Sequence, residues 1–357
     1  MGVTLIFPCC VPAAAQYAEA ATQRGEKIVA SSSLAFDETA KNFETWFRLP
    51  SVNDMDFAER LAEAVGKFDI ERIYSPVLMA WVVLNRLAEE KRLSVPVIGE
   101  MPIKRYTREH RQLMAAAAAR HEFIASISSG RSRLTLPEVA AILKLSGGIY
   151  GESNETKIAA VMAIFADAPR GDIVEIGVLT GRSAAVLLMM SRHHAIGNLL
   201  VVDPWSPSEA IQHDSPLDIQ GIVDAWQPGV AFESFLVALL PFAGNQDLNY
   251  LAQPSNRAHA VWLGERKVVS PEFGEVRYSS SIAVLHIDGN HDYASVSEDC
   301  ALWLPHLVPG GWLILDDYVW LHGDGPQRVG NELLEKRANE IQRAFTCGKA
   351  LFVKFGA

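Results

Sequence analysis

Cysteine is scarce in this sequence, and no run of apolar residues is long enough to cross a membrane. The N-terminus also lacks the basic stretch and the long apolar stretch of a signal peptide. These absences predict a cytoplasmic protein without a membrane partner. The cysteine spacing matches neither a zinc motif nor a disulfide framework, so we expect buried free thiols in a reducing compartment at all four positions: Cys9, Cys10, Cys300 and Cys347.

Positive charge is outweighed by negative charge. The chain of 357 residues has 32 Lys and Arg against 42 Asp and Glu, which gives a net charge of −10 at pH 7. This balance argues against nucleic acid as the main partner and favours a small molecule or another protein. No internal repeat, low-complexity stretch or coiled coil is present. The length and the 49% apolar content predict a globular protein with two domains.

The N-terminal part alternates between strand and helix patterns, which predicts parallel βαβ units over residues 1–105. The turn after its first strand, Phe-Pro-Cys-Cys-Val-Pro, has no glycine fingerprint. We therefore expect an auxiliary or oligomerisation domain rather than a nucleotide site. Residues 106–149 are predicted to form a helical linker.

A second α/β series occupies residues 150–357 and predicts a doubly wound sheet, which binds ligands beyond the carboxyl ends of its strands. The α/β fold class therefore has a C-terminal Rossmann-like sheet and a smaller N-terminal domain. Strands are expected at 172–176, 199–202, 249–252, 282–287, 312–315 and 351–355. Helices are expected at 156–166, 183–191, 232–240, 294–304 and 327–344.

A glycine loop follows the first strand of this series in Val-Glu-Ile-Gly-Val-Leu-Thr-Gly-Arg-Ser (174–183). Gly177 permits a close backbone approach to a ligand, and Gly181 permits tight entry into the next helix. Glu175 suits an ammonium group better than a phosphate, which favours an amino-acid-bearing cofactor over a dinucleotide. A simple tight turn is the alternative.

An aspartate, Asp203, ends the next strand about 20 residues after the glycine loop, where doubly wound folds place an acid for ribose hydroxyls. The alternative for Asp203 is a helix-capping role. Three further aspartates end later strands: Asp288 in Leu-His-Ile-Asp-Gly, and the pair Asp316 and Asp317 in Leu-Ile-Leu-Asp-Asp-Tyr. Gathered at one sheet edge, they would bind a hard divalent cation. Helix capping is the alternative for the pair.

Residues 150–357 resemble a class I S-adenosylmethionine-dependent methyltransferase in the glycine loop and the strand-end acid. Residues 282–318 resemble a metal-dependent subgroup that includes macrocin-type and mycinamicin-type sugar O-methyltransferases and cephalosporin-hydroxylase-like proteins. The resemblance implies that Mg²⁺, or another hard divalent cation, is bound by Asp288, Asp316 and Asp317. It also implies a set of residues that bind S-adenosylmethionine: Glu175, Gly177, Thr180, Gly181, Ser183, Asp203 and Ser255.

A general base is expected near the metal. His291 lies three residues past Asp288, the offset at which related metal-dependent enzymes carry their base, and a neutral imidazole can accept a hydroxyl proton. Some relatives have an acid where this chain has Asn290, so Asp292 is the reserve. The alternative is a solvent-facing loop histidine.

Two segments are candidates for the walls of an acceptor pocket. Residues 204–230 carry aromatic and polar side chains that would line a lid, although surface packing is equally consistent: Trp205, His213, Asp214 and Trp226. The stretch after the acid pair carries Trp320 and His322.

The sequence thus predicts an S-adenosylmethionine- and Mg²⁺-dependent O-methyltransferase that acts on a hydroxyl of a sugar or another small natural product. The alternatives are a metal-independent or nitrogen-directed methyltransferase, a non-catalytic cofactor-binding or scaffold protein, and an NAD-dependent oxidoreductase. The last is disfavoured because the loop lacks a complete Gly-x-Gly-x-x-Gly pattern. Relatives of this type often assemble, which leaves a homo-oligomer open.

Overall fold

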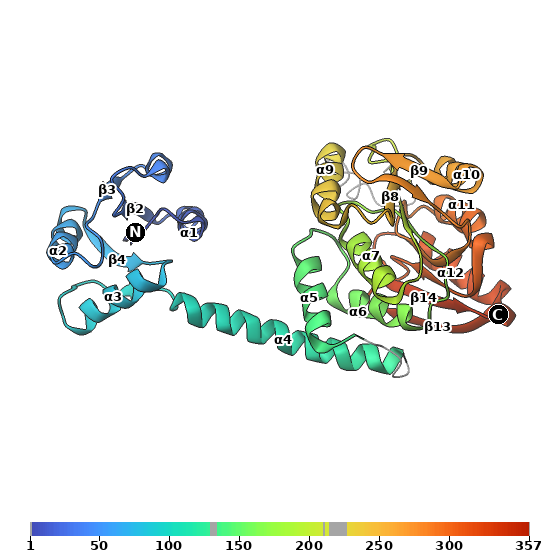
Figure 1. The fold of residues 1–357 in the computed structure, drawn as a ribbon, viewed down its shortest axis with the longest axis horizontal. Helices are drawn as coiled ribbons and strands as arrows, with labels where there is room; N and C mark the ends of the chain where they lie inside the picture. Colours follow the sequence, from blue (N-terminus) through green and yellow to red (C-terminus); the bar gives the residue numbers. More distant parts are fainter. Residues whose placement is uncertain (1, 129–133, 210, 214–226, 357) are drawn as a thin grey trace. The chain divides into compact units, whose positions relative to one another are not determined.

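The computed structural model describes residues 2–128, 134–209, 211–213 and 227–356. The chain divides into two compact units, Met1–Gln112 and Leu113–Ala357 (Figure 1). Helix α4 (Pro102–Ile127) contributes to both, and α5 (Leu136–Gly147) follows it in the second unit. The predicted linker therefore falls on two helices. None of the helices in the described ranges combines the length and the apolar character needed to span a membrane.

The first unit is a parallel five-stranded sheet in the order β3-β2-β1-β4-β5. Phe57 and Leu61 of one helix and Leu84 of another are buried in its core with Leu5 and Ile73. This confirms the smaller N-terminal α/β region. Its elements are β1 (Val3–Ile6), α1 (Pro12–Gln23), β2 (Lys27–Ser32), η1 (Glu38–Asn42), β3 (Trp46–Arg48), α2 (Phe57–Lys67), β4 (Ile70–Tyr74), α3 (Leu78–Glu89) and β5 (Val97–Ile98).

The second unit is built on a seven-stranded sheet in the order β13-β14-β12-β11-β6-β7-β8. The five strands from β12 to β8 are parallel, and β14 is antiparallel to both its neighbours. This confirms the predicted Rossmann-like sheet. The strands are β6 (Asp172–Ile176), β7 (Leu199–Val202), β8 (Leu248–Leu251), β11 (Ile282–Ile287), β12 (Leu307–Leu315), β13 (Ile341–Cys347) and β14 (Ala350–Phe355).

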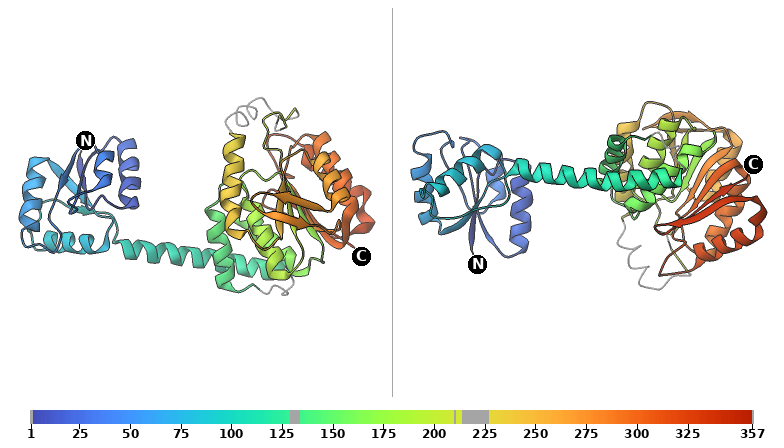
Figure 2. Two further views of the ribbon diagram at one scale, coloured as in Figure 1. Left: turned by 45° about the horizontal axis from the view of Figure 1, so that its top comes forward. Right: turned by 90° about the horizontal axis from the view of Figure 1, so that it is seen from below.

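Helices cover both faces of this sheet (Figure 2). The central strands are buried on both sides and are rich in apolar residues, as parallel strands usually are, although β6 also contains two buried acids, Asp172 and Glu175. One face is covered by α5, α6 (Glu155–Ile164), α7 (Arg182–His194) and α9 (Pro228–Leu239), and the other by α10 (Ser255–Glu265), α11 (Tyr293–Trp303) and α12 (Gly325–Lys336). Strands β9 (Lys267–Ser270) and β10 (Gly274–Arg277) pair with each other in a separate two-stranded sheet. Short 3₁₀ segments are η2 (Phe165–Asp167), η3 (Leu240–Phe242), η4 (Leu304–His306) and η5 (Ala338–Glu340).

The predicted helix over residues 327–344 is wrong in its second half. Helix α12 ends at Lys336, and Ile341–Cys347 forms β13, which pairs with β14. The Glu-, Lys-, Arg- and Ala-rich sequence has good helix propensity, but pairing with a neighbouring strand overrides that local preference. The sequence also gave no expectation for α10 or for the β9–β10 hairpin.

Candidate active site

A cavity of about 470 Å³ lies at the carboxyl edge of the second unit's sheet. Such a volume is within the range of small-molecule sites. Because parallel strands end at the same edge, loops from distant parts of the sequence meet there. The residues that line the cavity include Gly177, Ser183, Asp203, Trp205, Ser255, Asp288, His291 and Asp317.

The glycine loop passes close to the loop that follows β11. Gly177 has φ of +79°, and a Cβ atom at this position would lie 2.0 Å from the carbonyl oxygen of Asp288. At Gly181, where φ is +91°, a Cβ atom would lie 2.6 Å from Leu239 Cδ2. The positive φ favours glycine at both positions, and at Gly177 the neighbouring backbone also leaves no space for a side chain. The glycine loop is thus packed closely against the backbone of Asp288, one of the predicted metal ligands.

Asp203 holds the glycine loop through its carboxylate. Val178 N and Leu179 N donate to Asp203 Oδ2 at 2.8 and 3.1 Å, and Trp205 N donates to Asp203 Oδ1 at 2.8 Å. Burial raises the pKa of Asp203, although these backbone donors act in the opposite direction. The side chain also lines the cavity. Asp203 is therefore a loop-shaping residue that also faces the cavity.

The other predicted cofactor residues lie in different environments. Ser183 and Ser255 line the cavity, and the hydroxyl of Ser255 accepts a hydrogen bond from Trp303 Nε1 at 2.8 Å. Thr180 is buried and donates to the carbonyl oxygen of Tyr150. Glu175 is fully buried, and its Oε1 lies 2.9 Å from Nδ1 of His286. Glu175 is thus part of the wall behind the cavity rather than of its surface.

Strand alternation places Glu175, His286 and Asp316 on one face of the sheet. Ile173, Val284 and Ile314, two residues before each of them, belong to the core cluster on the α6 side. Helix α6 covers this face and supplies Lys157, which is 3% exposed. Lys157 was not predicted from the sequence. A signal was present, because it is the charged residue among the buried positions of an otherwise apolar helix.

The Lys157 ammonium bridges two of the three strand-end aspartates. It contacts Asp316 Oδ2 directly and lies 3.4 Å from Asp288 Oδ2. Burial alone would lower the pKa of Lys157, but the two carboxylates raise it above its usual value. Burial alone would raise the pKa of Asp316, but Lys157 lowers it well below its usual value. Burial and the neighbouring Asp316 raise the pKa of Asp288. The two carboxylates therefore favour the charged form of Lys157.

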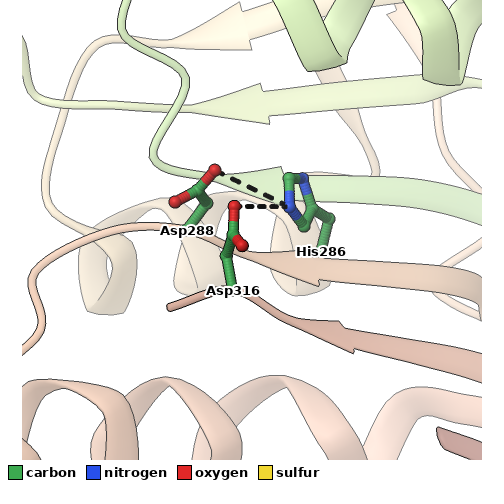
Figure 3. Close-up of side chains that lie close together, drawn as sticks. All are labelled: His286, Asp288 and Asp316. Carbon is green, nitrogen blue, oxygen red and sulfur yellow. Dashed lines mark ion pairs between the residues drawn. The ribbon is translucent and has the colours of Figure 1, made fainter. Parts of the chain in front are cut away.

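Two overlapping groups of ligand-type side chains share Asp288. The inner group comprises His286, Asp288 and Asp316, and Figure 3 shows their side chains pointing toward one another. Nε2 of His286 is 3.8 Å from Asp288 Oδ2 and 3.9 Å from Asp316 Oδ2. The outer group comprises Asp288, His291 and Asp317, all of which line the cavity. The three predicted metal acids are thus adjacent, but they belong to two groups.

The outer group fits a divalent cation by its chemistry. Asp317 Oδ1 is buried and has no hydrogen-bond partner among the described residues; the nearest cation, Lys349 Nζ, is 3.7 Å away. His291 Nε2 lies 3.1 Å from Asp317 Oδ2. Asp317 adopts φ of +49°, a conformation that is uncommon for a residue other than glycine and tends to occur at functional sites. Carboxylates with an imidazole beside them suit a hard or borderline divalent ion.

The remaining predicted residues surround this outer group. Asp292 is buried, and its Oδ2 accepts a hydrogen bond from His213 N at 2.8 Å. Trp205 and His213 line the cavity. Trp320 packs edge-on against His291, with ring centroids 4.4 Å apart, and His322 packs against Trp320. Asp214 and Trp226 lie outside the described residues.

Residues 174–318 match a protein-family model described as a methyltransferase domain. The matched stretch contains the glycine loop, Asp203, the three strand-end aspartates and His291. The matched stretch lies within the second unit, and its description agrees with the methyltransferase predicted from the sequence. No curated protein matches this chain.

Solved methyltransferase structures show a weak similarity to the chain. The O-methyltransferase NovP is 14% identical with a TM-score of 0.43, over 68% of this chain and 100% of NovP. A calicheamicin methyltransferase is 13% identical with a TM-score of 0.39, over 67% of this chain and 93% of its own. The O-methyltransferase TomG from Streptomyces achromogenes is 15% identical with a TM-score of 0.36, over 69% of this chain and 89% of its own.

Proposed function

We propose that this protein is a metal-dependent O-methyltransferase that transfers a methyl group from S-adenosylmethionine to a hydroxyl of a small molecule, a sugar or another natural product. One observation carries the proposal: Asp288, His291 and Asp317 line the same cavity as Gly177 and Asp203. A cofactor held by the glycine loop would therefore share its space with the acids and the imidazole. The resemblance of residues 282–318 to sugar O-methyltransferases supports the acceptor class.

The proposed cofactor site uses the residues that face the cavity. Ser183 at the start of α7 and the free N–H groups of that helix would bind the methionine carboxylate. Asp203 would bind the ribose, and Ser255 would lie near the adenine. Glu175 would act through His286 from behind the cavity, because it does not line it. Alignment of the acceptor oxygen with the methyl group is the main catalytic contribution of such a site.

The proposed metal residues are Asp288 and Asp317 at the cavity surface, with Asp316 behind them. A bound divalent cation would lower the pKa of the acceptor hydroxyl and hold it in place. His291 is the proposed proton acceptor, because its ring lies in the cavity wall and its Nε2 is oriented by Asp317. Asp292 is the weaker candidate, since its carboxylate already accepts the His213 N–H. The first unit is proposed to be an auxiliary or oligomerisation domain.

A second candidate, a metal-independent methyltransferase of the same fold, is favoured by one observation. The Lys157 ammonium already stands between Asp288 and Asp316, where it supplies a positive charge to the acids. In that case the chain itself would provide the electrostatic stabilisation that a metal provides elsewhere.

Calorimetry and methyl transfer together distinguish these candidates. S-adenosylhomocysteine should bind the full chain, and NAD should not. Methyl transfer from labelled S-adenosylmethionine to a panel of glycosides and catechols should stop in EDTA and return with Mg²⁺. Asp317→Asn should abolish transfer, whereas Asp324→Asn, which changes an exposed acid just before α12, should not. Full transfer in excess EDTA would establish the metal-independent candidate.

A further inference from the structure

We propose that the Lys157 ammonium occupies a cation position of its own between Asp288 and Asp316, so that the chain fills the inner group and any exchangeable cation binds to the two carboxylates of the outer group, Asp288 and Asp317. The outer part rests on the proposed function, whereas the inner part does not. A lysine in this place would act as a built-in counter-ion and a positioning residue for the acids.

The inner group has the ligand atoms of a cation site. Nε2 of His286, a carboxylate oxygen of Asp288 and one of Asp316 lie within 4.8 Å of one another. Nε2 of His286 is buried and has no hydrogen-bond partner among the described residues, although it faces both carboxylates. Two carboxylates and an imidazole suit Mn²⁺ or a similar ion. Lys157 Nζ contacts the same two carboxylates.

Burial makes this ammonium difficult to displace. Lys157 is 3% exposed and Asp316 is 8% exposed, so neither side chain can exchange its partner for water. Removing one partner of a buried ion pair leaves the other charge uncompensated, which is strongly unfavourable. Helix α6 also fixes the lysine, because Asn154 Oδ1 accepts hydrogen bonds from the backbone N–H groups of Thr156 and Lys157 at 3.0 and 2.9 Å. The lysine is therefore held at its backbone by the start of α6 and at its ammonium by the two carboxylates.

The cations of the site are divided in the same way. The buried Lys157 ammonium contacts the two carboxylates of the inner group. The half-exposed Lys349 ammonium lies 3.7 Å from Asp317 Oδ1 of the outer group. The buried cation therefore belongs to the inner group, whereas the outer group faces a lysine that is accessible to solvent.

The test is Mn²⁺ titration of the full chain, by calorimetry and by electron paramagnetic resonance, in the wild type and in Lys157→Met. The expected result is one more bound Mn²⁺ in Lys157→Met than in the wild type, whatever number the wild type binds. Lys157→Arg should keep the wild-type number, because it keeps the charge. The double variant Lys157→Met with Asp316→Asn should return to the wild-type number. An equal number in the wild type and Lys157→Met would overturn the inference.

A second measurement uses only the wild-type chain, so it does not depend on whether the variants fold. Crystals of the wild-type chain soaked in excess Mn²⁺ should show no anomalous peak between Asp288 and Asp316, with Lys157 still in contact with both. A peak in that position, with Lys157 displaced, would refute the built-in counter-ion. The proposed metal-dependent function fails separately, if the wild type shows no Mn²⁺ at Asp288 and Asp317.

Discussion

Nε2 of His291 lies 3.1 Å from Oδ2 of Asp317, and both side chains line the cavity that also contains the glycine loop. The two residues come from different strand ends, β11 and β12, which pair in parallel. Because their neighbour Asp288 belongs to both groups of ligand-type residues, the geometry links a candidate base to candidate metal ligands within one wall. This relationship leads to the first prediction.

Replacing His291 with Asn should lower kcat by about 10²–10⁴-fold, since general base catalysis contributes on that order. The affinity for S-adenosylhomocysteine should stay within about threefold, which corresponds to about 0.7 kcal/mol of binding free energy, because His291 is not proposed to contact the cofactor. Steady-state kinetics and calorimetry provide the two values. His110→Asn, at an exposed position of α4, should leave both unchanged. Unaltered kcat in His291→Asn would transfer the role of base to another residue.

Replacing Asp203 with Asn should weaken S-adenosylhomocysteine binding by about 10- to 100-fold. The carboxylate accepts three backbone N–H groups and shapes the loop, and hydrogen bonds to a charged group contribute about 1.5–3 kcal/mol each. The melting temperature of the ligand-free protein should fall as well, because the loop loses the charged acceptor of its backbone hydrogen bonds. Asp56→Asn on the surface of the first unit is the control. Normal affinity with a lower melting temperature would restrict Asp203 to the loop-shaping role.

Replacing Gly177 with Ala should destabilise the fold by about 3 kcal/mol or more, since it combines a positive φ with a steric clash. The added methyl would meet the Asp288 carbonyl oxygen at 2.0 Å. Urea unfolding gives the free energy of unfolding. Gly229→Ala in the first turn of α9 is the matched control, because nothing lies within 4 Å of a Cβ atom there. A change below about 1 kcal/mol at Gly177 would show that the two loops can separate.

Asp299 provides a prediction about pH. Burial raises the pKa of this α11 carboxyl from its usual 3.8 to about 6. The folded protein therefore binds a proton that the unfolded chain has lost, and stability falls as pH rises from about 4 to 6. Asp299→Asn removes this loss, so it should exceed the wild type by up to about 3 kcal/mol above pH 6 and by nothing near pH 3. Urea unfolding across this pH range measures the difference.

The matched control for that series is Ser297→Ala, which changes a neighbouring residue of α11 that does not ionise. Its stability relative to the wild type should not change between pH 4 and pH 8. A difference for Asp299→Asn that is also independent of pH would mean that the Asp299 carboxyl ionises in the fold as it does in water.

The strands of the second unit could be predicted because burial on both faces leaves an apolar signature that needs no knowledge of neighbours. Strands β6, β7 and β11 match their predicted bounds. Edge strand β13 lacks that signature: Gln342, Arg343 and Ala344 are exposed, and only pairing with β14 makes the segment extended. The sequence could not reveal this pairing.

The candidate site was predictable where chemistry follows strand ends and unpredictable where it depends on packing. Asp288 and Asp317 follow apolar strands, so their meeting at one edge could be predicted. The separation of Asp316 from the cavity could not, because it depends on which face of the sheet α6 covers. Lys157 is about 130 residues before Asp288 in the sequence and has no motif spacing to it. Only the packed helix places its ammonium among the acids.

The turn between β13 and β14 lies next to the buried Lys157 and to Asp317, which lines the cavity. A Cβ atom at Gly348 would lie 3.3 Å from Lys157 Cβ. The ammonium of the next residue, Lys349, lies 3.7 Å from Asp317 Oδ1, and its carbonyl oxygen accepts a hydrogen bond from Val319 N at 2.9 Å. One surface turn thus contacts both the helix position that carries the buried lysine and an acid that lines the cavity. An insertion of a single residue there would move the Lys349 ammonium relative to Asp317, and so change the charge around the candidate site without altering any of its acids, imidazoles or glycines.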